Sequence, residues 1–206
     1  MGLSFPQLAQ NKDPTFVQTL INNKIINQYA FGVNLNYQQH KRSFISFGAP
    51  DTDLFEGELK KYPIDQGYSY SIRVKGISIG DGPLLSSPSA LLDTGNTCIS
   101  IPNKYESSIL KEFNQNGNKC GFDNEDYAPQ FSLLRCKVTN HDSLPPLKIN
   151  INNDIYEIDH NAYMQRCIKR SDGDLCDTYI ESVKYNNLLF LGDGFFSRYY
   201  AYFNIG

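Results

Sequence analysis

The amino-acid sequence predicts a mainly β fold for this chain of 206 residues. Three observations lead to that prediction. Several short segments alternate apolar and polar residues, which is the pattern of a strand with one buried face. Turn-forming Asn, Asp and Gly residues stand between those segments. Only two segments space their apolar residues as an amphipathic helix does, and many short strands with few helices are typical of β domains.

The first predicted helix follows Asp13, which we expect to be its N-cap, with Pro14 at the first helical position. The second begins at Asn103, and Glu106 three residues later completes a pair that resembles a capping box. The apolar stripes consist of Phe16, Val17, Leu20 and Ile21 in the first helix and of Ile109, Leu110 and Phe113 in the second. We therefore expect each helix to bury one face.

Most other patterned segments are predicted strands. Residues 72–79 nearly alternate, and Gly76 interrupts the alternation as a β-bulge does. Residues 147–151 and 155–158 alternate on either side of an Asn-Asn-Asp turn, which predicts a hairpin. Residues 199–205 form a further aromatic strand.

Composition excludes several classes of protein. The formal net charge is −3, so the chain offers no basic face for nucleic acid. No run of 18 apolar residues occurs, so we expect no membrane span. The first six residues hold no basic residue, and we expect no secretory signal within the chain.

Five cysteines bear on the cellular compartment. Cys120, Cys136, Cys167 and Cys176 lie near turn-like sequence, which suits two disulfides in an oxidising compartment. Cys98 lies in an apolar run and is expected to be a buried free thiol. Five reduced cysteines in a cytosolic protein are the alternative. No two cysteines have C-x-x-C spacing, so we expect no metal, and nothing indicates a cofactor.

The segment 90–99 carries the most specific chemical signal. An apolar strand ends at Asp93, and we expect Gly95 to allow the tight turn that follows. Burying a carboxylate there is costly unless hydrogen bonds or a useful pKa shift accompany it. Taken alone, Asp93-Thr94-Gly95 is also compatible with an ordinary Asx turn that closes a hairpin.

The sequence around this tripeptide favours a catalytic loop. Apolar residues precede Asp93, hydroxyl and apolar residues follow it, and Leu-Phe-Leu-Gly-Asp occurs at 189–193. This pattern resembles the pepsin-like aspartic proteases, in which each lobe holds an Asp-Thr-Gly loop beside a strand that ends in glycine. Further segments that resemble the family are 2–6, 31–35, 55–59, 143–163 and 191–203.

The resemblance implies a pepsin-like aspartic protease fold with one complete-looking C-terminal β lobe and a remnant of the N-terminal lobe. Residues 1–60 would be the end of the N-terminal lobe and the strands between the lobes. Residues 61–206 would be the C-terminal catalytic lobe, to which the family usually adds one more strand after the position of Gly206. The implied activity is that of an aspartic-type endopeptidase, which acts on a peptide or protein substrate.

The resemblance also assigns roles to residues. Asp93 would be one member of a catalytic pair of aspartates. Thr94 would brace the loop against the opposite lobe, Gly95 would let backbone approach the carboxylate, and Asn96 and Thr97 would support the loop. The Asn96 side-chain amide is expected to donate to Asp93.

Two further features follow from the resemblance. Tyr68 and Tyr70 would line the substrate site, although core packing explains them equally well. Cys136 would pair with Cys176, which leaves Cys120 to pair with Cys167.

The chain departs from the family pattern in two ways. It holds no second Asp-Thr-Gly and no Asp-Ser-Gly, so the partner aspartate and the flap tyrosine would precede residue 1. Asn96 stands where the family usually has Thr or Ser. We therefore expect the chain alone to be inactive without the missing N-terminal lobe. Its parent protein would be secretory, lysosomal or vacuolar, or extracellular.

Two alternatives stay open. A catalytically inactive protein-binding descendant of the fold would account for Asn96 and for the absent second aspartate. A homodimer that pairs two Asp93 loops in the manner of retroviral proteases is the other, although the long segment before Asp93 fits a connector between lobes better.

Overall fold

The computed structural model describes residues 3–9, 13–36, 42–65, 69–123, 130–184 and 186–206. Two compact units divide the chain. Unit 1 comprises Met1–Ser71 with Phe196–Gly206, and unit 2 comprises Ile72–Phe195. This division differs from the expected one between residues 60 and 61. The C-terminal segment returns to unit 1 because its strand pairs with a strand near the start of the chain.

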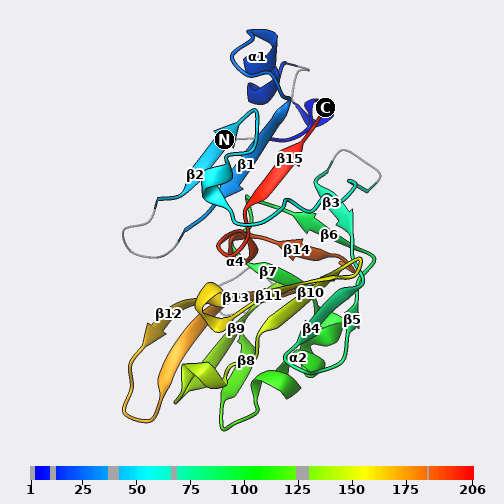
Figure 1. The fold of residues 1–206 in the computed structure, drawn as a ribbon. Helices are drawn as coiled ribbons and strands as arrows, with labels where there is room; N and C mark the ends of the chain where they lie inside the picture. The colour runs from blue at the N-terminus through cyan, green and yellow to red at the C-terminus, as the bar shows by residue number, and fades with distance from the viewer. Residues whose placement is uncertain (1–2, 10–12, 37–41, 66–68, 124–129, 185) are drawn as a thin grey trace. The chain divides into compact units, whose positions relative to one another are not determined.

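Unit 1 is built on a three-stranded antiparallel sheet in the order β15-β1-β2 (Figure 1). Its strands are β1 (Ala30–Asn34), β2 (Phe44–Phe47) and β15 (Ala201–Asn204). Phe31 on β1 lies opposite Phe203 on β15, and their rings stack with centroids 4.7 Å apart. The ring of Tyr70 packs edge-on against both of these rings. An aromatic cluster therefore forms the core of this unit.

The helices of unit 1 are short: η1 (Pro6–Leu8), α1 (Phe16–Asn22) and η3 (Thr52–Leu54). The N-cap of α1 is Thr15, whose hydroxyl accepts a hydrogen bond from the Gln18 amide, and not Asp13 as the sequence suggested. Thr15 can take the cap position because its backbone is extended and its side chain reaches the third helical residue. The predicted helix is therefore present, but it begins after Thr15 and not after Asp13.

Unit 2 contains a four-stranded sheet in the order β11-β10-β4-β5. Its strands are β4 (Gly76–Ile79), β5 (Leu85–Ser86), β10 (Leu147–Ile151) and β11 (Asp154–Ile158). β10 and β11 form the predicted hairpin, and Asn152 has a positive φ in its turn. Gly76 has φ +141°, and a Cβ there would lie 2.1 Å from the Leu85 carbonyl oxygen. Only glycine fits at this close crossing.

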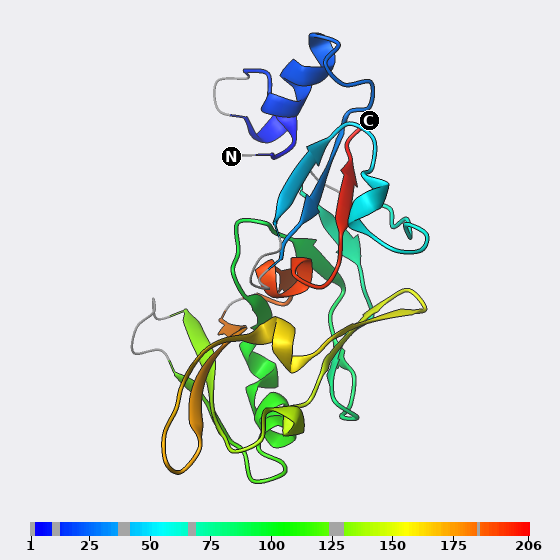
Figure 2. The same ribbon diagram turned by 60° about the vertical axis from the view of Figure 1, so that its left-hand side comes forward.

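The larger sheet of unit 2 has the order β3-β6-β14-β7-β13-β9-β8, with β12 also paired to β13. Figure 2 shows the hairpin of β12 and β13 in orange at the lower left. The bounds are β3 (Ser71–Arg73), β6 (Ser89–Leu92), β7 (Ile99–Pro102), β8 (Lys119–Asp123), β9 (Phe131–Val138), β12 (Met164–Ile168), β13 (Asp174–Val183) and β14 (Leu189–Leu191). The predicted mainly β fold is confirmed.

The second predicted helix is also present. A 3-10 turn, η4 (Asn103–Tyr105), leads into α2 (Glu106–Phe113), which buries Ile109 and Phe113. The other short helical elements of unit 2 are η5 (His141–Ser143), α3 (His160–Tyr163) and α4 (Asp193–Phe196), the last of which ends at the boundary with unit 1. Within the described ranges, none of the helices has the length and apolar character that a membrane crossing requires.

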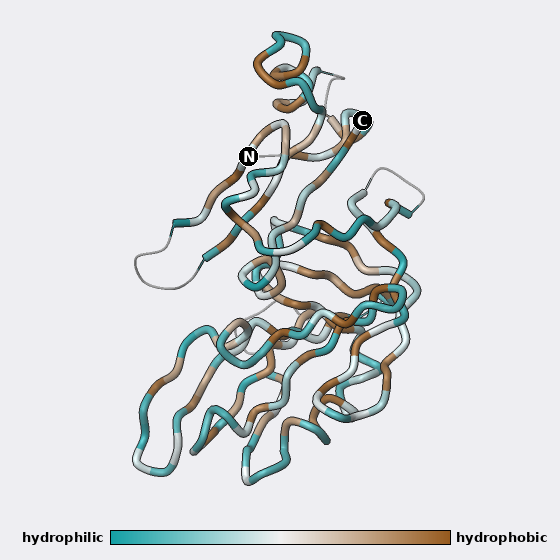
Figure 3. Tube along the Cα trace, in the orientation of Figure 1, coloured by the Kyte–Doolittle hydropathy of each residue, from teal (hydrophilic) through white to brown (hydrophobic). Residues whose placement is uncertain are grey.

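The core of unit 2 follows the alternating pattern of its strands. Along β10, Leu147, Ile149 and Ile151 are buried, while the intervening residues are partly exposed. Figure 3 shows brown, apolar stretches along β6, β14 and β7 and teal, polar stretches along the hairpin of β12 and β13. The neighbouring strands β6, β14 and β7 are therefore apolar strands of the large sheet.

A pair of isoleucines on neighbouring strands tests this core. Ile149 is 0% exposed on β10, whereas Ile155 is 63% exposed on β11. We expect Ile149→Ala to lower the free energy of unfolding by about 2–5 kcal/mol, because it leaves a buried cavity. Ile155→Ala should cost less than about 1 kcal/mol. Urea denaturation of both variants measures the difference, and equal losses would contradict the assigned strand register.

Candidate active site

β14 lies between the two strands that flank the Asp93 loop (Figure 1). It runs parallel to β6, with Leu191 opposite Leu92, and antiparallel to β7, with Leu191 opposite Ile99. Asp93 follows the last residue of β6, and Ile99 opens β7. The loop 93–98 therefore crosses over the end of β14.

Backbone hydrogen bonds attach the loop to that strand end. The Asp93 amide donates to the Leu191 carbonyl at 3.1 Å, and the Gly192 amide donates to the Cys98 carbonyl at 3.1 Å. The Asp193 amide donates to the Asn96 carbonyl at 3.0 Å. The loop is thus held at its beginning, middle and end.

The close approach of the loop to the end of β14 requires glycine at position 192. A Cβ at this position would lie 2.2 Å from the Asn96 carbonyl oxygen and 2.5 Å from the Cys98 carbonyl oxygen. Both neighbours are backbone atoms, so no side-chain rotation relieves the clash. The glycine that follows the apolar strand is therefore part of the loop architecture.

The Asp93 carboxylate sits on a tight turn. The Asn96 amide donates to the Asp93 carbonyl at 3.1 Å, and the Gly95 amide donates to Asp93 Oδ1 at 2.9 Å. The φ angle of Gly95 lies outside the left-handed region, so the turn itself does not demand glycine, contrary to the expectation. A Cβ at Gly95 would lie 3.2 Å from Asp93 Oδ1, however, so glycine does ease the approach of backbone to the carboxylate.

A buried polar network lies behind the loop. The Asn96 side-chain amide donates to Ser100 Oγ at 2.8 Å, and Ser100 Oγ donates to Glu181 Oε1 at 2.5 Å. Asn96 Oδ1 accepts from the Cys98 amide at 3.2 Å. The expected bond from Asn96 to Asp93 is replaced by these contacts, because the side chain turns toward β7 and β13.

Burial changes the acidity of two groups beside the loop. It raises the pKa of Glu181 above the usual carboxyl range, against the opposing effect of hydrogen bonds from Ser100 and Asn96. Burial, with added repulsion from Glu181 and Asp193, raises the pKa of the Cys98 thiol to about 12. Cys98 is confirmed as a buried free cysteine.

Sequence reasoning missed Glu181. A single charged residue inside the otherwise uncharged β13 segment Tyr179–Val183 was the available signal, since a charged side chain is almost never fully buried unless partnered. Its partner Ser100 lies directly opposite on the parallel neighbour β7. Only the pairing of these distant strands brings the two residues together.

The other expected site residues fall into three groups. Thr94, Gly95 and Thr97 are exposed on the loop, and the bracing role of Thr94 stays a prediction. Tyr68 lies outside the described residues. Tyr70 packs in the aromatic cluster of unit 1, and its hydroxyl donates to the Leu3 carbonyl, which favours the packing interpretation.

The expected disulfide pairing is wrong. The bridges join Cys120 to Cys136 and Cys167 to Cys176. The four cysteines form a row across β8, β9, β13 and β12, each opposite the next. Cys120 and Cys167 stand at the two ends, roughly 14 Å apart at the usual strand spacing. A disulfide spans Cα atoms less than about 7 Å apart, so these two cannot pair.

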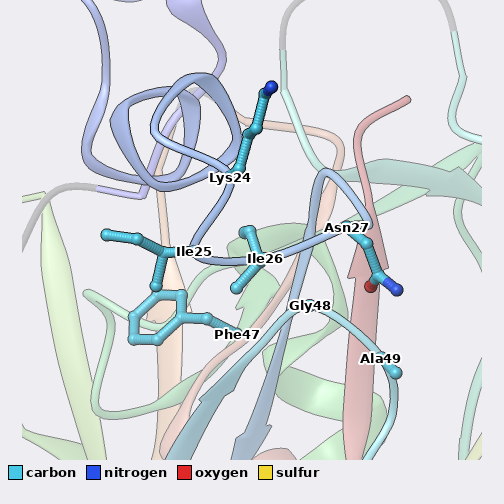
Figure 4. Close-up of a pocket in the computed structure, with 7 residues that line it drawn as sticks. All are labelled: Lys24, Ile25, Ile26, Asn27, Phe47, Gly48 and Ala49. Atoms are coloured by element: carbon cyan, nitrogen blue, oxygen red, sulfur yellow. The ribbon is translucent and has the colours of Figure 1, made fainter.

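A shallow pocket in unit 1 is not an alternative catalytic centre. Its lining residues are Lys24, Ile25, Ile26, Asn27, Phe47, Gly48 and Ala49. Figure 4 shows the Lys24 side chain pointing away from Ile25 and Phe47. No carboxylate, imidazole or thiol is among the lining residues, so they offer no general base.

The whole chain is similar in sequence to known proteins. A family model described as "eukaryotic aspartyl protease" matches residues 1–206. Human gastricsin is 26% identical over 215 residues, which cover 100% of this chain and 51% of that protein. Rhizopuspepsin-2 of Rhizopus niveus is 28% identical over 208 residues, which cover 99% of this chain and 49% of that protein. The chain thus spans about half the length of these relatives.

Gly192→Ala tests the close approach at the end of β14. We expect it to lower the free energy of unfolding by about 2 kcal/mol or more, because the added methyl displaces backbone. Gly121→Ala is the matched control, since nothing lies within 4 Å of a Cβ there. Urea unfolding compares the two. Equal stability of both variants would show that the loop does not lie against β14.

Glu181→Gln tests the buried carboxyl. Because burial raises the folded-state pKa of Glu181, ionisation of the unfolded chain destabilises the wild type as pH rises above about 4.5. Gln keeps an acceptor for Ser100 but does not ionise. We expect the variant to gain stability relative to wild type between about pH 4 and 7. Parallel stability curves across that range would contradict the burial of this carboxyl.

Proposed function

The chain belongs to the eukaryotic aspartyl protease family, and on this premise we propose that it supplies one catalytic carboxylate, Asp93, of an aspartic-type endopeptidase. The observation that carries the proposal is the Asp93 turn held over the end of β14 by three backbone hydrogen bonds. The carboxylate is partly exposed, and the Gly95 amide fixes one of its oxygens.

The chemistry requires a second carboxylate. Two carboxyl groups a few ångströms apart cannot both ionise, so they share one proton and titrate as a pair. The ionised member takes a proton from a water molecule, which attacks the peptide carbonyl, while the protonated member donates to the carbonyl oxygen. The carboxyl that took the proton from water then passes a proton to the leaving nitrogen, and the peptide bond breaks without a covalent intermediate. This mechanism favours an acidic pH optimum.

The 206 residues hold a single Asp-Thr-Gly sequence. We therefore assign the second carboxylate to sequence outside these residues, in an N-terminal lobe that Thr94 would contact. A polypeptide of residues 1–206 alone is expected to be inactive, because one carboxylate cannot both activate the water and hold the shared proton.

The substrate and compartment follow from the same proposal. The substrate is a peptide or protein that meets Asp93 from the solvent side of the loop. The two disulfides suit an oxidising compartment, which is secretory, vacuolar, lysosomal or extracellular.

One observation favours a second candidate function, a non-catalytic protein-binding descendant. The Asn96 side chain bonds to Ser100 and not to the Asp93 carboxylate. A catalytic loop that loses a donor to its carboxylate loses part of the control over its protonation. An upstream sequence without Asp-Thr-Gly or Asp-Ser-Gly would favour this candidate.

The decisive experiment begins with the coding sequence upstream of Met1. We expect it to encode an Asp-Thr-Gly or Asp-Ser-Gly. The extended protein should cleave a denatured protein substrate at acid pH, and Asp93→Asn should lower the rate at least about 1,000-fold, because it removes one member of the pair.

Asp81→Asn is the matched control, because this aspartate is fully exposed in the hairpin between β4 and β5, and it should leave the rate unchanged. Cleavage by the 206-residue chain alone that depends on Asp93 would refute the need for a second lobe. An extended protein that carries both aspartates and shows no activity would refute the enzymatic proposal.

A further inference from the structure

The hairpin of β12 and β13 carries a set of side chains that the proposed protease chemistry does not use. Cys167 and Cys176 lie directly opposite each other, and His141 from η5 approaches them. One ligand atom from each of the three residues lies within 4.8 Å of the others. We propose that, when this disulfide is reduced, the two thiolates and His141 bind a thiolate-preferring divalent cation such as Zn²⁺.

The donor set matches the chemistry of zinc. Zn²⁺ prefers four tetrahedral ligands, with Zn–S distances of about 2.3 Å and Zn–N distances of about 2.0–2.1 Å. Ligand atoms in such a tetrahedron stand roughly 3.3–3.8 Å apart, so the observed spacing needs only small side-chain rotations. Residues opposite each other on paired strands project from the same face, so both sulfurs face His141.

Asp174 completes the surroundings of the imidazole. Its Oδ2 lies 3.1 Å from His141 Nε2. A carboxylate beside a metal-binding histidine fixes the tautomer and the orientation of the ring. Two thiolates and one imidazole leave the fourth position of the ion to water.

The proposed metal site is buried on one side and open to solvent on the other. Cys176 is 0% exposed, whereas Cys167 is partly exposed and the His141 side chain is 36% exposed. An ion can therefore enter past His141 and Cys167 and contact a sulfur that solvent does not reach.

The site exists only in the dithiol form. A phosphine reductant attacks the Cys167–Cys176 disulfide, and hydrolysis with one water yields the phosphine oxide and two thiols. The disulfide gains two electrons, and the phosphorus loses two. Binding of Zn²⁺ then releases both thiol protons, so metal binding and the redox state are linked.

The spacing of these residues in the sequence does not predict the cluster. His141 precedes Cys167 by a whole hairpin, and no short metal motif joins them. The contact arises because η5 follows the end of β9, which pairs with β13 so that Val138 lies opposite Asp174.

The test titrates the full chain with Co²⁺, whose thiolate complexes show charge-transfer bands and, when tetrahedral, intense visible bands. After phosphine reduction we expect one Co²⁺ per chain, displaced by Zn²⁺, and no such binding before reduction. His141→Ala should weaken the affinity at least tenfold. His160→Ala is the matched control, because His160 also faces a carboxylate, that of Asp142, but lies outside the cluster. It should leave binding unchanged.

The other bridge supplies a second control. Reduction also frees Cys120 and Cys136, so the variant Cys120→Ser/Cys136→Ser removes their thiols, and it should keep the reduction-dependent binding if it folds. If this variant does not fold, the comparison of His141→Ala with His160→Ala shows whether the metal binds at His141. Equal binding by both histidine variants, binding without reduction, or loss of binding in a folded Cys120→Ser/Cys136→Ser variant would overturn the proposal.

A redox titration gives a readout that does not involve protease activity. Zn²⁺ at ten times its dissociation constant should raise the midpoint potential of the Cys167–Cys176 pair by about 30 mV, since a tenfold change in a two-electron equilibrium corresponds to that shift. An unchanged potential would contradict the proposal.

Discussion

The close approach of β14 to the Asp93 loop is the constraint on which the site depends. The backbone at Gly192 lies so near the carbonyl oxygens of Asn96 and Cys98 that a single methyl group would separate them. This approach lets one strand end accept and donate hydrogen bonds to the whole loop. The position of the Asp93 carboxylate is therefore set by backbone contacts, which the proposed catalytic role requires, because small displacements of a reacting group cost rate.

The polar network behind the loop complements that constraint. Glu181 is 9% exposed, and its Oε1 accepts a hydrogen bond from the Ser100 hydroxyl, which in turn accepts one from the Asn96 side-chain amide. A buried polar network is stabilising only when its members are satisfied, so the loop conformation and the protonation of Glu181 are coupled. The loop thus has one carboxyl, that of Asp93, on its partly exposed side and another, that of Glu181, buried behind it.

The sequence predicted the parts of the fold that local patterns determine. The β10–β11 hairpin follows from the alternation of apolar residues within one segment. The Asp93 turn and the apolar strand that ends at Gly192 were each predicted from one short segment as well. Contacts between strands that are distant in the sequence could not be predicted in this way. The row of cysteines required the register of four strands, and the family resemblance alone gave the wrong pairs. Likewise, the resemblance left Tyr70 open between the substrate site and core packing, and its hydroxyl and ring contacts within unit 1 favour the packing interpretation.

Hydrogen exchange measured residue by residue is the most direct test that the Asp93 loop is fixed to β14. We expect the amides of Asp93, Gly192 and Asp193 to be protected as strongly as that of Ile99 in β7, because each of the three donates to a backbone carbonyl where the loop meets β14. Exchange of these amides as fast as that of the exposed Gly117 would contradict it, since the carboxylate would then sit on a loop that opens freely.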